Sequence, residues 1–209
     1  MPNPTPERSL PAGWRHYLPA FCAALAAACA HAGDVQTAPS VGDYALSVYA
    51  GRLTNGDWIE SFGPNTHFID SDLVVAALGR TVARSHEGAL TYELEGQIGK
   101  HSGLQDHWEY NLLGAVRWHR LPWSGRLHSS VAAGLGLSYA TEVPAAEATL
   151  INGASEKLLA YWHLELTLGP PRADWQATLR LHHRSTAYGL FGDDGGSNAI
   201  TLGVRYAFR

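Results

Sequence analysis

From residue 42 to the C-terminus, apolar and polar residues alternate with a period of two, in segments separated by turns rich in Gly, Pro, Asp and Ser. This period places successive side chains on opposite faces of a β-strand. An even number of such segments, each about ten residues long, is typical of a transmembrane β-barrel. We count eight segments: 42–53, 70–84, 88–101, 106–121, 126–140, 157–169, 174–188 and 197–208.

The segment 106–121 shows the pattern clearly. One row carries Trp108, Tyr110, Leu112, Gly114, Val116 and Trp118, and the other carries Glu109, Asn111, Arg117 and His119. Aromatic residues stand at both ends of the apolar row, as membrane interfaces favour. We therefore predict an all-β fold, an eight-stranded antiparallel transmembrane β-barrel of the bacterial outer membrane over residues 42–209. The faces of segment 70–84, which is apolar on both rows, stay unassigned.

The rows expected to face the interior are balanced in charge. They carry Glu93, Glu95, Glu109 and Glu165 against Arg117, Arg180, Arg184 and Arg205. Side chains fill an eight-stranded barrel, and buried charges persist when they are paired. The rows therefore predict an internal salt-bridge network rather than a channel.

The first 41 residues differ from the rest. Arg8 and Arg15 precede an apolar run over 17–30 that ends in Ala30-His31-Ala32. The run is shorter than the roughly 20 residues of a spanning helix, so it indicates a cleaved signal peptide over 1–32, followed by a periplasmic segment over 33–41. Export to the outer membrane of a Gram-negative cell follows. Both cysteines lie within the signal peptide, so the mature barrel contains no disulfide.

The connections expected between strands differ in length. The long ones, 54–69, 141–156 and 189–196, are expected to be extracellular, with 102–105 as a short exception. The short turns near 85–87, 122–125 and 170–173 are expected to be periplasmic. The mildly acidic net charge of -4 and the absence of Lys/Arg clusters argue against a nucleic-acid partner.

Two polar residues interrupt the apolar row of segment 174–188. His183 and Ser185 share the row of Leu179 and Leu181, while the opposite row carries arginines and is expected to face the interior. Residues two apart on one strand face lie about 7 Å apart at Cα, within reach of a Ser-to-His hydrogen bond. A nucleophile and its base would thus stand side by side on the lipid-facing surface.

A third residue would have to orient the imidazole. Asn198 begins the outward row of the last strand, and Asp193 and Asp194 precede it. An amide can hold a histidine tautomer but supplies no negative charge. Oxyanion donors would come from Asn198 or from backbone amides near Gly189, Gly192, Gly195 and Gly196. The 11 histidines show no ligand spacing on a common element, so no metal site is predicted from them.

The last two segments, from Leu181-His182-His183-Arg184-Ser185 to Asn198-Ala199-Ile200-Thr201-Leu202, resemble the C-terminal hairpin of the outer-membrane lipid A 3-O-deacylases. These are eight-stranded barrels with a His-x-Ser-Asn motif on the lipid-facing side. The resemblance implies His183 as base and Ser185 as nucleophile, which remove an ester-linked acyl chain from lipid A without a metal or cofactor. Thr186 stands where the family has Asn, and Asn198 stands where it has an acidic Glu.

Two functions are therefore open. One is a lipid A deacylase-like esterase with Ser185, His183 and Asn198 as its site and lipid A or lipopolysaccharide of the outer leaflet as its partner. The other is a non-catalytic outer-membrane barrel with a structural or surface-binding role. The sequence chooses neither an oligomeric state nor between lipid A and a phospholipid as substrate.

Overall fold

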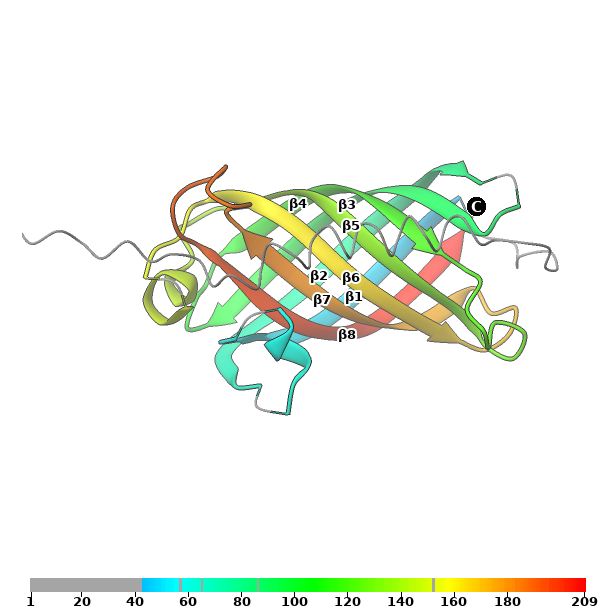
Figure 1. The fold of residues 1–209 in the computed structure, drawn as a ribbon, viewed down its shortest axis with the longest axis horizontal. Helices are drawn as coiled ribbons and strands as arrows, with labels where there is room; N and C mark the ends of the chain where they lie inside the picture. Colours follow the sequence, from blue (N-terminus) through cyan, green and yellow to red (C-terminus); the bar gives the residue numbers. More distant parts are fainter. Residues whose placement is uncertain (1–42, 57, 65, 86, 152) are drawn as a thin grey trace, which may run out of the picture. The chain divides into compact units, whose positions relative to one another are not determined.

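The computed structural model describes residues 43–56, 58–64, 66–85, 87–151 and 153–209, so the predicted signal peptide and periplasmic segment lie outside the described residues. Eight antiparallel strands form one closed barrel (Figure 1). They are β1 Tyr44–Thr54, β2 Phe68–Arg84, β3 Leu90–Gly103, β4 Trp108–Trp118, β5 His128–Ala140, β6 Leu158–Gly169, β7 Trp175–Ser185 and β8 Gly196–Phe208. No described helix is long and apolar enough to cross a bilayer.

Each strand pairs with the next one in sequence, and β1 pairs with β8 from Tyr44 opposite Phe208 to Thr54 opposite Asn198. The predicted eight-stranded barrel is confirmed. Strand β7 ends at Ser185, three residues before the expected end, because Ala187 and Tyr188 have φ values of 50° and 61°. This left-handed conformation cannot continue a strand.

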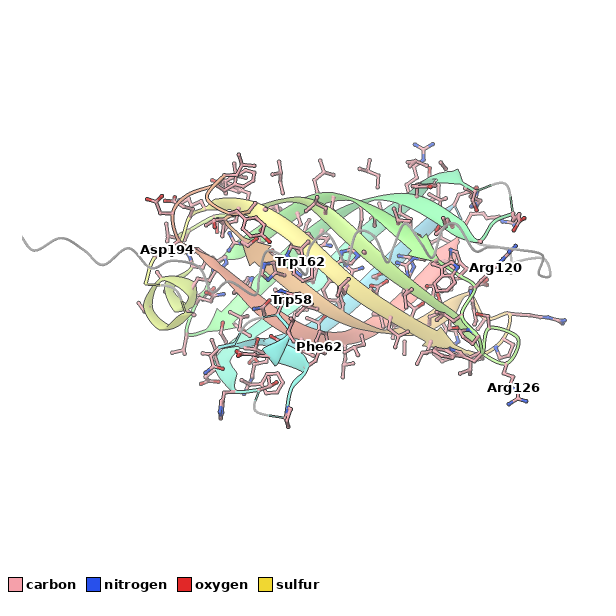
Figure 2. The ribbon with its side chains drawn as sticks, in the orientation of Figure 1. Trp58, Phe62, Arg120, Arg126, Trp162 and Asp194 are labelled. Carbon is pink, nitrogen blue, oxygen red and sulfur yellow. The ribbon has the colours of Figure 1, made fainter. Side chains whose placement is uncertain are left out.

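Antiparallel pairing puts alternate connections at opposite ends of the barrel. We call the end with the β1–β2, β3–β4, β5–β6 and β7–β8 connections the loop end, and the other the turn end. Figure 2 shows Asp194 at the loop end, with Arg120 and Arg126 at the turn end.

The outer wall is an apolar belt between two sets of aromatic side chains. Its exposed aliphatic residues include Leu46, Val48, Val74, Leu78, Leu94, Ile98, Leu112, Leu135 and Leu202. The aromatic side chains are Trp108, Tyr110 and Tyr139 toward the loop end, and Tyr44, Tyr92, Trp175 and Tyr206 toward the turn end. A belt of this kind is stable in contact with lipid, so the barrel spans a membrane.

The middle of the interior holds the predicted ion-pair network. Arg180 contacts Glu95 at 2.7 Å and Glu165 at 2.6 Å. Arg117 contacts Glu165 at 2.7 Å and Glu93 at 3.0 Å, and Arg205 contacts Glu93 at 2.9 Å. The guanidinium groups therefore compensate buried carboxylates on several strands at once.

Two expected members of this network pair elsewhere. Arg184 contacts Glu147 at 3.0 Å. Glu147 belongs to the short helical turn η3 (Glu147–Ile151) in the β5–β6 connection. Glu109 instead receives hydrogen bonds from His101 and His182. The β5–β6 connection therefore inserts a carboxylate into the barrel, which the strand pattern does not predict.

The inward row of β2 is apolar, which explains why its two faces were indistinguishable in the sequence. Leu73, Val75 and Ala77 face the interior, and they cluster there with Tyr49 and Leu53 of β1. The interior thus combines an apolar cluster beside β1 and β2 with a charged network across the other strands.

Candidate functional site

The imidazole of His183 and the hydroxyl of Ser185 both belong to the outward row of β7. Arg180, His182 and Arg184 form the opposite row and are buried in the interior. The facing predicted from the period of two is therefore correct for these two residues. Both are only partly exposed, although they lie on the outer wall.

His183 is hydrogen-bonded to Asn198, which lies directly opposite it on β8. Nδ1 of His183 lies 2.6 Å from Oδ1 of Asn198. The Asn198 amide nitrogen donates to the carbonyl oxygen of Gly56 at 2.9 Å, so the amide oxygen must face the ring. Oδ1 can only accept, and Nδ1 therefore carries the proton. This tautomer leaves Nε2 of His183 as the basic nitrogen.

Ser185 occupies the next outward position, opposite Gly196 on β8 and Ala160 on β6. Among the hydrogen bonds of the described residues, none joins its hydroxyl to His183. A Cβ at Gly196 would lie 2.3 Å from the carbonyl oxygen of Arg184, so only glycine permits this close pairing. Gly196 thereby allows the register that brings Asn198 opposite His183.

The described residues of the connection over 55–67 lie along this part of the outer wall instead of extending from the end of the barrel (Figure 1). The ring of Trp58 meets Trp162 edge-on at 5.6 Å, and Trp162 packs on His183 at 4.4 Å between ring centroids (Figure 2). Thr54 and Ser61 share a hydrogen bond of 2.7 Å at the base. This connection, named the cover loop below, contains the 3-10 turn η2 (Glu60–Phe62).

Two residues of outward rows are buried, and the hydrogen bond from Asn198 to Gly56 of the cover loop accounts for one of them. Leu181 is 0% exposed and Asn198 is 6% exposed, although both belong to outward rows. Trp58, Gly56 and Trp162 were missed as site residues by the sequence reasoning. Trp162 could have been found, because its strand position pairs with His183 once the β6–β7 register is assigned. No periodic pattern indicates where an irregular loop folds.

A groove of about 480 Å³ lies on the outer wall beside the cover loop. Ile200, which pairs with Leu181 on one side and Arg52 on the other, lines it together with Leu202 and Phe68. Its wall is mostly apolar and suits a hydrocarbon chain.

The alternative acids do not reach the imidazole. Asp193 and Asp194 are exposed in the β7–β8 connection, and neither is hydrogen-bonded to His183. Among the described residues, Asn198 is therefore the side chain that orients this histidine.

A second cluster lies inside the barrel at the loop end. One ligand atom each of His101, His107 and Glu109 lies within 4.8 Å of the others. The hairpin formed by β3 and β4 brings them together, since His101 pairs with His107 through a backbone hydrogen bond of 3.0 Å. Tracing the register of this hairpin beyond its paired strands would have revealed the cluster from the sequence.

The protein is therefore an eight-stranded transmembrane barrel whose outer wall carries the polar pair His183 and Ser185. Among solved structures, the outer membrane enzyme PagL matches with a TM-score of 0.56 and 12% identity, over 78% of this chain and 99% of PagL. Neisserial surface protein A also matches, with a TM-score of 0.46 and 11% identity, over 81% of this chain and 99% of that protein. The likeness to PagL shows the fold. No family model and no curated protein sequence matches the chain.

Proposed function

We propose that the protein is an outer-membrane esterase that removes an ester-linked acyl chain from lipid A, with Ser185 as nucleophile and His183 as general base. The observation that supports this most strongly is the His183–Asn198 hydrogen bond on the outer wall. It holds the imidazole in the tautomer that a base needs, with Nε2 as the unprotonated nitrogen.

The reaction would proceed through an acyl-enzyme. Nε2 of His183 removes the proton from Oγ of Ser185 as that oxygen attacks the ester carbonyl carbon. The tetrahedral intermediate then collapses, the bond to the sugar oxygen breaks, and His183 returns the proton to that oxygen. A water molecule, activated by the same nitrogen, hydrolyses the Ser185 ester and releases the fatty acid.

In the present arrangement Ser185 and His183 do not share a hydrogen bond. Catalytic hydrogen bonds are often long or misaligned without substrate and tighten in the complex. A rotation of the Ser185 side chain about one bond brings Oγ toward the neighbouring outward residue, and no described hydrogen bond holds the hydroxyl elsewhere.

The location of the pair selects the substrate class. Both residues lie toward the loop end of the wall, where the predicted orientation places the outer leaflet. The apolar groove, lined by Ile200 and Leu202 of the neighbouring strand β8, offers space for an acyl chain. An acylated lipid can therefore approach the pair laterally, without leaving the membrane, and reaches His183 once part of the cover loop is displaced.

A non-catalytic barrel is the second candidate, and two observations favour it. Asn198 supplies no negative charge for the imidazolium that forms during catalysis, and the cover loop shields His183. In this case His183, Asn198 and Trp162 would only anchor the cover loop to the wall.

Mass spectrometry of lipid A separates the two candidates. Cells that make the wild-type barrel are expected to lose one acyl chain from lipid A, whereas cells that make Ser185→Ala keep all of them. Heat-modifiable gel mobility must show that both barrels are folded. Ser129→Ala is the matched control, because it removes a buried hydroxyl of β5 outside the proposed site. This variant should behave as the wild type.

Intact lipid A in cells with folded wild-type barrel would contradict a lipid A deacylase. The purified barrel is then tested on phospholipid esters in the same way. Failure on both substrates would leave the non-catalytic barrel.

A further inference from the structure

The three-residue cluster inside the loop end has the composition of a metal site. It contains His101 on β3, His107 in the β3–β4 connection and Glu109 on β4, and all three side chains are buried. Two histidines and one glutamate are a common ligand set for Zn²⁺, with water or another donor completing the coordination. We propose that His101, His107 and Glu109 bind one Zn²⁺-class transition-metal ion at the loop end of the barrel interior.

Glu109 differs from the other buried carboxylates. Glu93, Glu95, Glu147 and Glu165 each contact an arginine. The recorded partners of Glu109 are His101 at 2.7 Å, His182 at 2.8 Å and Ser138 at 3.0 Å. Among the buried carboxylates that the structure describes, it is thus the one without a guanidinium partner. A carboxylate surrounded by imidazoles is a metal ligand environment rather than an ion-pair environment.

The two carboxylate oxygens of Glu109 have different hydrogen-bond partners. His182 and Ser138 both bond to Oε1, whereas Oε2 meets only His101. Hydrogen bonds from neighbouring side chains to a metal-coordinating group orient that group toward the ion. Oε1 is therefore held in place while Oε2 points at the cluster.

Two buried polar atoms at the cluster have no hydrogen-bond partner. One is Nε2 of His107, whose side chain is 3% exposed, and the other is Oε1 of Gln105. The Gln105 amide nitrogen lies 2.9 Å from Nδ1 of His101. Buried polar atoms are rarely left unpaired, so each one requires an explanation.

Metal binding would satisfy both atoms. Nε2 of His101 becomes a ligand and loses its hydrogen bond with Glu109, while its proton moves to Nδ1. If the Gln105 amide turns over, Oε1 accepts that proton's hydrogen bond and fixes the ligand tautomer. His107 then coordinates through a ring nitrogen. The rings of His101 and His107, now stacked at 4.3 Å and 15°, have to turn until their nitrogens converge.

The test uses the full mature barrel, refolded in detergent and titrated with Zn²⁺ by calorimetry. Wild-type barrel is expected to bind one ion, and Co²⁺ in its place should show the visible absorption of a tetrahedral site. His107→Gln is expected to abolish this binding. His67→Gln changes an exposed histidine of the cover loop outside the cluster and should leave binding unchanged.

Gln105 provides a more specific variant. Gln105→Leu removes the partner of His101 Nδ1 and is expected to weaken Zn²⁺ binding by about ten- to a hundredfold. Gln105→Glu, which can accept from Nδ1, should restore it. Equal weakening by Leu and Glu would contradict the assigned orienting role.

A third measurement needs no substitution. In barrel labelled with ¹⁵N-histidine, Zn²⁺ should shift ring nitrogens of two histidines and convert one of them from the Nε2–H to the Nδ1–H tautomer. No Zn²⁺ binding by folded wild-type barrel, or binding that shifts no histidine nitrogen, would overturn the proposal. Because none of the cluster belongs to the Ser185–His183 pair, this result is independent of the proposed esterase activity.

Discussion

In the proposed esterase, Asn198 is the residue that orients the general base His183. Its amide connects the imidazole of His183 to the backbone of the cover loop at Gly56. The same two bonds fix the amide orientation and the histidine tautomer. They stabilise the imidazolium less than a carboxylate would, because the amide oxygen carries only a partial charge.

Replacing this amide by a carboxylate tests the point. In Asn198→Asp the side chain has the same length, so an oxygen stays near the 2.6 Å from Nδ1 that the amide oxygen has now. For the proposed esterase, we expect ester hydrolysis to accelerate by about tenfold or more. The upper limit of the gain is on the order of ten-thousandfold, which is the loss in turnover when the aspartate of a serine triad is replaced by asparagine. The rate of fatty acid release from lipid A by purified barrel measures it.

The double variant Asn198→Asp with Ser185→Ala is the control and should be inactive. The Asp variant also loses the bond to Gly56, so folding is checked by heat-modifiable mobility. A folded Asn198→Asp barrel with unchanged rate would mean that Asn198 does not occupy the position of the acid.

At the level of elements, the cover loop decides whether the pair on the wall is accessible. It is held by the Trp58–Trp162 contact, the Asn198–Gly56 hydrogen bond and the Thr54–Ser61 hydrogen bond. Ile59 and Phe62 on the loop are 53% and 54% exposed, so the loop continues the apolar surface of the barrel over the pair. In the proposed esterase, a lipid substrate would have to displace part of this loop to reach His183.

Trp58→Ala tests whether loop opening limits access. An aromatic pair contributes about 0.5–1.5 kcal/mol beyond its buried area, so its loss should raise the open population roughly two- to tenfold. Hydrogen–deuterium exchange over 55–67 is expected to accelerate by that factor, and acyl-chain release should rise with it.

Phe62→Ala removes an exposed aromatic ring from the same loop and should change neither quantity appreciably. If Trp58→Ala exchanges like the wild type, the Trp58–Trp162 contact does not hold the loop closed.

At the scale of the whole molecule, closure of the barrel and pairing of its interior charges depend on each other. The barrel buries Arg117, Arg180 and Arg205 among carboxylates from different strands. Burial of these ions is costly unless every partner is present. The network therefore couples the strands to one another and fills the interior.

Arg180→Met is expected to reduce the free energy of unfolding by about 3–5 kcal/mol, because it leaves buried carboxylates unpaired. Urea titration followed by tryptophan fluorescence measures the change. Arg52→Met is the matched control, since Arg52 pairs with Asp72 on the outer wall with 46% and 50% of the two side chains exposed. Exposed pairs of this kind contribute within about 1 kcal/mol. Equal losses in the two variants would contradict the coupling.

The sequence by itself determined the strands, the closed barrel and the outward facing of His183 and Ser185. These features depend on a period of two, which is local and is written in every strand. The partnership of His183 with Asn198 was also accessible, because both stand on outward rows of adjacent strands and the hairpin register places them opposite each other.

Only the tertiary structure decided the path of the cover loop and the pairing of Arg184 with Glu147. Trp58 and Glu147 lie in irregular connections, whose path depends on contacts far away in the sequence. The faces of β2 also needed the fold, because two apolar rows differ only in what they pack against. Alternation indicates which side of a strand a residue occupies; the partner it finds there depends on how the whole chain closes.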